Sequence, residues 1–159
     1  MTQSDLGLLP ARALFRHYTG QGTSPPGCPE RCRDGERGRY LADERVASAV
    51  RTAIAVERPL LVTGEPGTGK TALAWSVASE LGLGPVLEFH TRSDHTARDV
   101  LYFFDHVLRF YDAQTHSAQA RDPAAYVTLR ALGAALSSPA RRVVLIDEID
   151  KAARDFPND

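Results

Sequence analysis

The sequence predicts an α/β fold in which a parallel sheet is flanked by helices. Two short apolar runs, Leu60–Thr63 and Val143–Ile146, have the length and composition of strands buried in such a sheet. Stretches with the apolar spacing of amphipathic helices lie between them. A glycine-rich segment, Gly64–Thr71, joins the first apolar run to a helical stretch.

The bulk composition is that of an ordinary globular chain. Its 159 residues are 43% hydrophobic and 25% charged, which is enough for one domain with a core. A formal net charge of −1 gives no electrostatic reason to expect nucleic acid or an anionic membrane as a partner. Neither a long apolar run nor a signal peptide is present, so we expect a soluble, cytoplasmic protein.

The chain is predicted to comprise an N-terminal extension over residues 1–38, partly disordered, and a core over residues 39–159. Within the extension, Leu6–Tyr18 has enough apolar residues for a short docking helix, and Gly20–Gly38 lacks periodicity. Its arginines alternate with acidic residues, which favours a solvated surface over a nucleic-acid patch. Cys28 and Cys32 are interpreted as free thiols, with half of a metal site as the alternative.

The core elements follow from apolar periodicity and from helix start and stop signals. The first three predicted elements are a helix over Leu41–Glu57 with Asp43 as N-cap, a strand over Leu60–Thr63, and a helix over Thr71–Leu81 ending at Gly82. A strand over Pro85–Phe89 follows, and then an amphipathic helix that carries Val100, Leu101, Phe104, Val107, Leu108 and Tyr111. The last two are a helix that starts at Asp122-Pro123 and ends before Ser137-Ser138-Pro139, and a strand over Val143–Ile146.

The segment Gly64–Thr71 reads GEPGTGKT and matches the phosphate-loop pattern G-x-x-x-x-G-K-[ST]. Its glycines let backbone N–H groups approach phosphate oxygens at the positive end of the following helix. Lys70 adds a point charge for the β- and γ-phosphates, and the Thr71 hydroxyl can bind Mg²⁺. Pro66 stiffens the loop, since it has no N–H to donate. The predicted nucleotide contacts in this segment are Gly64, Glu65, Pro66, Gly67, Thr68, Gly69, Lys70, Thr71 and Ala72.

A second motif follows the last apolar run, where Val143–Ile146 leads into Asp147-Glu148-Ile149-Asp150. Asp147 is predicted to hold Mg²⁺ through water, and Glu148 to orient and deprotonate the attacking water. With Lys70, Glu148 forms the predicted catalytic pair. Lys151 is the only lysine besides Lys70. We interpret it as a helix-cap or surface residue, with a phosphate or neighbouring-subunit contact as the alternative.

The stretches PLLVTGEPGTGKTALA and VVLIDEIDKAARDFPND together resemble the AAA+ ATPases, and RSDHTARDVLYFFDHVLRFYDAQ resembles their MoxR-like branch. The resemblance runs from Tyr40 to Asp159. It implies a three-layer phosphate-loop fold that binds ATP and Mg²⁺, with Tyr40, Leu41 and Ala42 near the adenine base. It also implies homo- or hetero-oligomeric rings, usually hexamers, that remodel proteins with a von Willebrand factor A-type partner. Thr115–Leu136 would be an insert presented towards the central pore.

Members of that family continue past the acidic strand, through a sensor strand, an arginine finger and a helical lid. On this comparison the core is incomplete at its C-terminus. A further strand separates the first from the third in the family's sheet. We therefore expect either that Val143–Ile146 pairs directly with Leu60–Thr63 or that the piece is unstable. An arginine finger contributes about 10³ to 10⁵ in rate, so we expect weak ATP binding and little hydrolysis by the chain alone.

Three functions follow from these observations. The first is an ATP-driven protein remodeller. The second is a non-catalytic nucleotide-binding or assembly module, docking on a full-length relative through the helix near Leu14. The third is a DNA-associated AAA+ loader, which the near-neutral charge disfavours.

Overall fold

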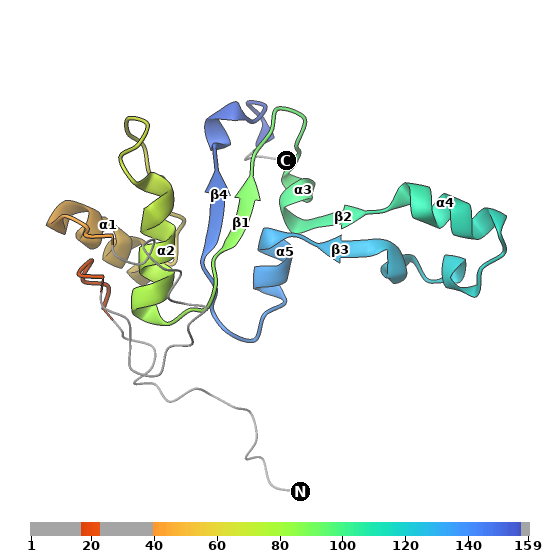
Figure 1. Cartoon of the computed structure of the whole chain (residues 1–159), viewed down its shortest axis with the longest axis horizontal. Helices are drawn as coiled ribbons and strands as arrows, with labels where there is room; N and C mark the ends of the chain where they lie inside the picture. Colours follow the sequence, from red (N-terminus) through yellow and green to blue (C-terminus); the bar gives the residue numbers. More distant parts are fainter. Residues whose placement is uncertain (1–16, 23–39, 157–159) are drawn as a thin grey trace, which may run out of the picture. The chain divides into compact units, whose positions relative to one another are not determined.

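The computed structural model describes residues 17–22 and 40–156 (Figure 1). The chain divides into two compact units, residues 1–82 and residues 83–159, and each is described by itself. The first unit contributes helices and the second combines helices with a parallel strand pair, so the predicted α/β class is confirmed. None of the helices in the described ranges is both long and apolar enough to cross a bilayer.

The first unit contains two helices that the sequence predicts well. Helix α1, Glu44–Ala55, begins after Asp43, whose carboxylate accepts a hydrogen bond from the Val46 N–H at 2.8 Å. Helix α2, Lys70–Leu81, ends at Gly82, which adopts a left-handed conformation with φ of 68°. Both caps are therefore set by local sequence.

The core of the first unit includes a residue from the predicted extension. Tyr18 is only 1% exposed and packs with Ala47, Val50 and Leu73. Residues 17–22 are not helical, so the predicted helix over Leu6–Tyr18 does not include its last two residues. The rest of that helix lies outside the described residues, as do Cys28 and Cys32.

Leu60–Thr63 does not form the predicted strand. No strand in the described ranges pairs with it, and Leu61 is 72% exposed. A strand is stabilised by its ladder of hydrogen bonds to a neighbour, and an apolar run without that neighbour has no reason to be regular. The expectation that Val143–Ile146 either pairs with this segment or leaves the piece unstable stays a prediction.

The second unit is built on a parallel pair of strands, β1 over Leu87–His90 and β4 over Val144–Asp147. Both strands were predicted, with bounds that lie one or two residues earlier in the chain than the observed ones. Phe89 packs with Val100, Ala131 and Phe156 in a second core. All four residues of β4 are only half-buried, so the prediction that this strand is buried on both faces is wrong.

The helix predicted around Val100–Tyr111 is interrupted by a strand. Helix α3 covers Ala97–Leu101, strand β2 covers Tyr102–Phe104, and helix α4 covers His106–Gln114. The consecutive aromatic residues of β2 favour extended backbone when a partner strand is available. That partner comes from later in the chain, which helical periodicity cannot reveal.

The partner is β3, Val127–Leu129, which runs antiparallel to β2 with Tyr102 opposite Leu129. Asp122 does start a helix, since its carboxylate accepts the Ala124 N–H at 3.0 Å, but this helix is a single 3₁₀ turn. The predicted continuous helix is therefore wrong, although its predicted end is confirmed. The remaining elements are η4 (Ala118–Arg121), η5 (Pro123–Tyr126), α5 (Ala131–Leu136) and η6 (Ile149–Lys151).

Candidate nucleotide-binding site

The loop before α2 has the backbone that a phosphate cradle needs. Gly67 and Gly69 have φ values of 80° and 83°, a region that residues with a Cβ rarely adopt. At Gly69 there is a second constraint, because an added Cβ would lie 2.9 Å from Tyr40 Cε2. At Gly67 an added Cβ would meet nothing within 4 Å. The loop is exposed up to Thr68 and becomes half-buried at Gly69.

Lys70 extends across the loop. Its ammonium donates hydrogen bonds to the carbonyl oxygens of Gly64, at 2.9 Å, and Glu65, at 2.8 Å. The Thr68 hydroxyl donates to the same Glu65 carbonyl at 2.9 Å. These bonds close the loop around the ammonium. An ammonium has three protons, and two of them account for its bonds to the described residues.

Helix α2 presents its N-terminus to this loop. The helix has 12 residues, and Gly69 at its N-cap has no side chain that could compete for the first-turn N–H groups. Those groups and the positive end of the helix dipole favour an anion. Thr71 is exposed and Ala72 half-buried in this turn.

Buried polar contacts fasten α2 to residues 17–22. Glu80 is 7% exposed, and its carboxylate accepts hydrogen bonds from the Thr19 N–H, the Thr19 hydroxyl (2.7 Å) and the Gly20 N–H (3.1 Å). Tyr18 and Ser76 join their hydroxyls at 2.9 Å. Burial raises the pKa of the Tyr18 phenol above its usual value. The helix that carries Lys70 is therefore held by groups that the sequence did not mark as part of the site.

The residues predicted near adenine differ in their surroundings. Tyr40 packs against the core of the first unit and lies next to Gly69. Leu41 is 71% exposed. The backbone of Ala42 is held by a hydrogen bond, in which its N–H donates to the Gly20 carbonyl at 3.0 Å. Tyr40 is therefore the one of the three that adjoins the loop.

In the second unit, Asp147 ends β4 and Glu148 follows it in a left-handed conformation, with φ of 55° and ψ of 39°. The Glu148 N–H donates to Asp147 Oδ1 at 3.0 Å. Left-handed backbone costs a residue with a Cβ about 1–2 kcal/mol. Such strain in a short turn is typical of functional positions, where the side chain must be aimed.

The Glu148 carboxylate is paired with Lys151, whose Nζ lies 2.8 Å from Oε1. Both side chains are more than half exposed. The hydrogen bond to Glu148 raises the pKa of the Lys151 ammonium. Sequence reasoning treated Lys151 as a cap or surface residue and missed this pair. The signals that could have found it are the rarity of lysine in this chain and the i,i+3 spacing within a helical turn.

The oxygen donors fit Mg²⁺ that arrives with a nucleotide. Among the described residues, no three His, Cys, Asp or Glu side chains gather into a metal cage. Mg²⁺ is usually bound by one or two protein oxygens together with phosphates and water. The Thr71 hydroxyl in the first unit and the Asp147 carboxylate in the second are each an oxygen donor of this kind.

Residues 54–158, more than half of the chain, match a family described as AAA domain. The chain is similar to RuvB-like helicase 1 of Emericella nidulans, with 40% identity over 73 residues, and to RuvB-like protein 1 of Arabidopsis thaliana, with 37% identity over 73 residues. Each alignment covers 44% of this chain and 16% of the relative. No solved structure gives a significant match.

Proposed function

The chain belongs to the AAA domain family of ATPases, and we propose from this that it binds Mg²⁺·ATP through Gly64–Thr71 and that Glu148 is its hydrolytic base. The observation that carries the proposal is the position of the Lys70 ammonium, held across a loop of left-handed glycines at the N-terminus of α2. A cation next to backbone donors at a helix N-terminus supports the binding of triphosphate oxygens.

In the proposed reaction, each residue has a defined role. Lys70 neutralises charge on the β- and γ-phosphates, and Thr71 and Asp147 provide oxygens for Mg²⁺. Glu148 accepts a proton from water as the water oxygen attacks the γ-phosphorus. The bond from that phosphorus to the β–γ bridging oxygen breaks, giving ADP and inorganic phosphate. For Glu148 to act, its carboxylate must leave Lys151.

Nucleotide binding is tested with the two lysines of the chain. We expect Lys70→Met to weaken binding of a fluorescent ATP analogue at least tenfold, because a charge-assisted contact to phosphate is lost. Lys151→Met removes the same charge and changes affinity little. Equal losses in both variants, or none in Lys70→Met, would contradict the proposed site.

Hydrolysis is tested separately, by phosphate release. Glu148→Gln should leave nucleotide affinity unchanged and remove any turnover that the chain shows, since an amide cannot accept the proton. Turnover that survives this substitution would exclude Glu148 as the base.

The pair formed by Glu148 and Lys151 favours one alternative, a nucleotide-binding module that does not hydrolyse. The Glu148 carboxylate must break its contact with the Lys151 ammonium before it can take a proton from water. If the unaltered chain binds the analogue and shows no phosphate release, this alternative holds. Turnover gained in Lys151→Met would show that the ion pair is what blocks hydrolysis.

The finer assignments also remain proposals. We infer protein remodelling in an oligomeric ring, within the MoxR-like branch and with a von Willebrand factor A-type partner, from the resemblance of the segment 92–114 to that branch. The relative named RuvB-like helicase 1 raises DNA as the competing substrate, which the net charge of −1 disfavours. Salt-dependent DNA binding would support the competing assignment. Cytoplasmic location stays a prediction.

A further inference from the structure

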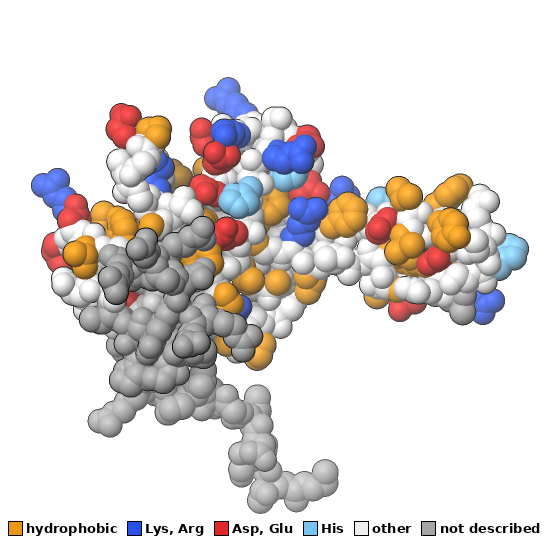
Figure 2. Space-filling model, in the orientation of Figure 1, with side chains coloured by type: hydrophobic (Ala, Val, Ile, Leu, Met, Phe, Trp, Pro, Cys, Tyr) orange, Lys and Arg blue, Asp and Glu red, His pale blue; other side chains and the backbone are white. Residues whose placement is uncertain are grey.

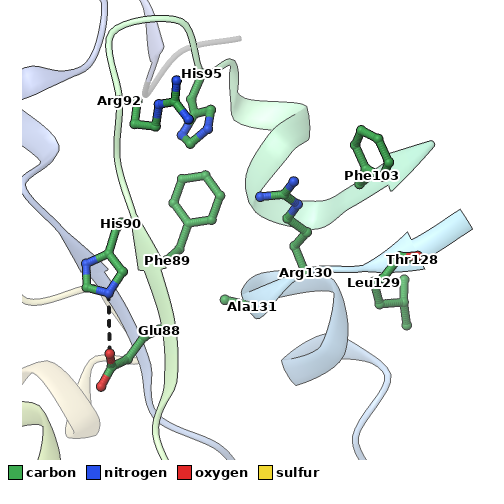
Figure 3. A pocket seen from close by; sticks show the side chains of 10 residues that line it. All are labelled: Glu88, Phe89, His90, Arg92, His95, Phe103, Thr128, Leu129, Arg130 and Ala131. Carbon is green, nitrogen blue, oxygen red and sulfur yellow. Dashed lines mark ion pairs between the residues drawn. The ribbon is translucent and has the colours of Figure 1, made fainter. Parts of the chain in front are cut away.

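A groove of about 660 Å³ lies in the second unit, along β1 (Figure 3). Its volume is in the range of ligand-binding sites. Side chains from β1, the loop after it, and the β2–β3 pair form its walls. The residues that line it are Glu88, Phe89, His90, Arg92, His95, Phe103, Thr128, Leu129, Arg130 and Ala131.

One wall of the groove is the free edge of a strand. On the side of β1 that faces β4, the Leu87 N–H donates to the Val143 carbonyl at 2.9 Å and the Thr91 N–H donates to the Asp147 carbonyl at 3.0 Å. Alternation along a strand therefore directs the N–H and C=O groups of Glu88 and His90 to the other edge of β1. No strand in the described ranges pairs with that edge. These backbone groups are available to an added strand.

The side of β1 that faces the β2–β3 pair is cationic and aromatic. Figure 3 shows Phe89 pointing towards Arg130, while Glu88 and His90 lie together on the opposite side of the strand. The Arg130 guanidinium lies 5.6 Å from the centre of the Phe103 ring and makes no ion pair with the described residues. Arg92 also lines the groove, although it pairs with Asp94 at 3.3 Å. The ligand that fits this wall carries a carboxylate beside an apolar surface.

A buried polar atom lacks a partner in the same wall. His95 lies against Phe89, with ring centres 4.9 Å apart, and its Nδ1 is buried without a hydrogen bond to any described residue. Buried polar atoms in folded proteins are nearly always hydrogen-bonded. The Thr91 hydroxyl is the other buried polar side-chain atom without a partner among the described residues, and it directly follows β1.

We propose that this groove binds an extended acidic peptide segment, which adds a strand to the free edge of β1 and places a carboxylate on Arg130. A strand of four residues such as β1 is roughly 13 Å long, and that length of edge offers a row of backbone groups that a small anion cannot use. Side chains of an extended peptide alternate, so every second residue would face Phe89 and Arg130. Main-chain bonds would supply affinity and the carboxylate specificity. No nucleotide is required, so this proposal stands apart from the ATP site.

The test uses the full chain and a short fluorescein-labelled peptide of alternating Thr and Glu, with fluorescence anisotropy as the readout. We expect this peptide to bind, and its counterpart of alternating Thr and Lys not to bind. Arg130→Gln should weaken binding about tenfold through loss of one charge-assisted pair. Arg141→Gln, an exposed arginine outside the groove, is the matched control and should bind normally. Equal binding of both peptides, or an unchanged affinity in Arg130→Gln, would overturn the proposal.

The strand addition itself is tested on the unaltered chain, so that folding of a variant cannot confuse the result. N-methylation of either the Glu or the Thr backbone nitrogens should abolish binding, while methylation of the other set should leave it intact. Equal effects of the two sets would contradict pairing along β1. Free glutarate that competes as well as the peptide, at equal carboxylate concentration, would show a small-anion site and would also overturn the proposal.

Discussion

The phosphate loop of the first unit and the acidic turn of the second are supported in opposite ways. Lys70 stands on a helix whose inner face is tied down by Tyr18 and Glu80, both less than a tenth exposed. Glu148 stands on a strained turn after a half-buried strand, and its partner Lys151 is exposed. Buried hydrogen bonds to a charge are costly to break, whereas exposed ion pairs contribute little. We therefore expect the phosphate loop to stay fixed on its helix and the acidic turn to exchange its contacts readily.

The largest expected effect comes from removing the buried support of α2. Glu80→Ala leaves three donors on Thr19 and Gly20 without their acceptor, so we expect a loss of about 3 kcal/mol in the free energy of unfolding. Urea denaturation measures this loss. Glu65→Ala is the matched control, since Glu65 is exposed, and it should change the midpoint little. Similar midpoints for both variants would remove the distinction between the two regions.

A smaller effect separates two glycines of the phosphate loop. Gly67→Ala and Gly69→Ala both place a Cβ on left-handed backbone, at about 1–2 kcal/mol each. Only the second also drives the new methyl against Tyr40, so Gly69→Ala should be the more destabilising by about 1 kcal/mol. Thermal unfolding of the pair measures the difference. If Gly67→Ala proves the worse, Tyr40 does not pack on the loop as described.

The smallest effect concerns the second unit and appears only in alkali. The Tyr126 phenol donates to Asp112 at 2.7 Å, and burial together with that carboxylate raises the pKa of Tyr126 to about 12. The contact joins η5 to α4, in the part of the surface where Figure 2 shows hydrophobic side chains gathered. Because the pKa in the folded protein exceeds the usual tyrosine value of 10.0, the stabilisation is complete below pH 10 and is lost as the pH rises through about 12.

Ultraviolet absorbance of tyrosinate tests this expectation. Tyr126→Phe should remove a late-titrating tyrosine, and Asp112→Asn should shift that titration to lower pH, since the negative charge is gone. Tyr111→Phe removes an exposed tyrosine and is the control. Burial also raises the pKa of Tyr18, so the readout is the amplitude of the late step. An amplitude that is unchanged in Tyr126→Phe would assign the raised pKa elsewhere.

Much of the second unit could not be predicted, and the aromatic run of β2 shows why. Val100, Phe104 and Tyr111 fit a helix by spacing, and the backbone is nevertheless extended at Tyr102–Phe104. What decides the outcome is Val127–Leu129, some twenty-five residues later, because a strand forms only when its partner is present. Leu60–Thr63 is the opposite case: its sequence is typical of a strand, but no described strand pairs with it and it does not form one.

The sequence by itself determined the start of α1 after Asp43 and the C-terminal ends of α2 and α5, and it carries the phosphate-loop and acidic motifs. These features depend on residues within a few positions of one another, such as Asp43 capping Val46 or Gly82 ending α2. The tertiary structure alone decided the burial of Tyr18 and Glu80, the antiparallel pair, and the free edge of β1 beside Arg130. Each of these brings together residues far apart in the chain. Local sequence does not reveal which distant residue a side chain will bond to or pack against.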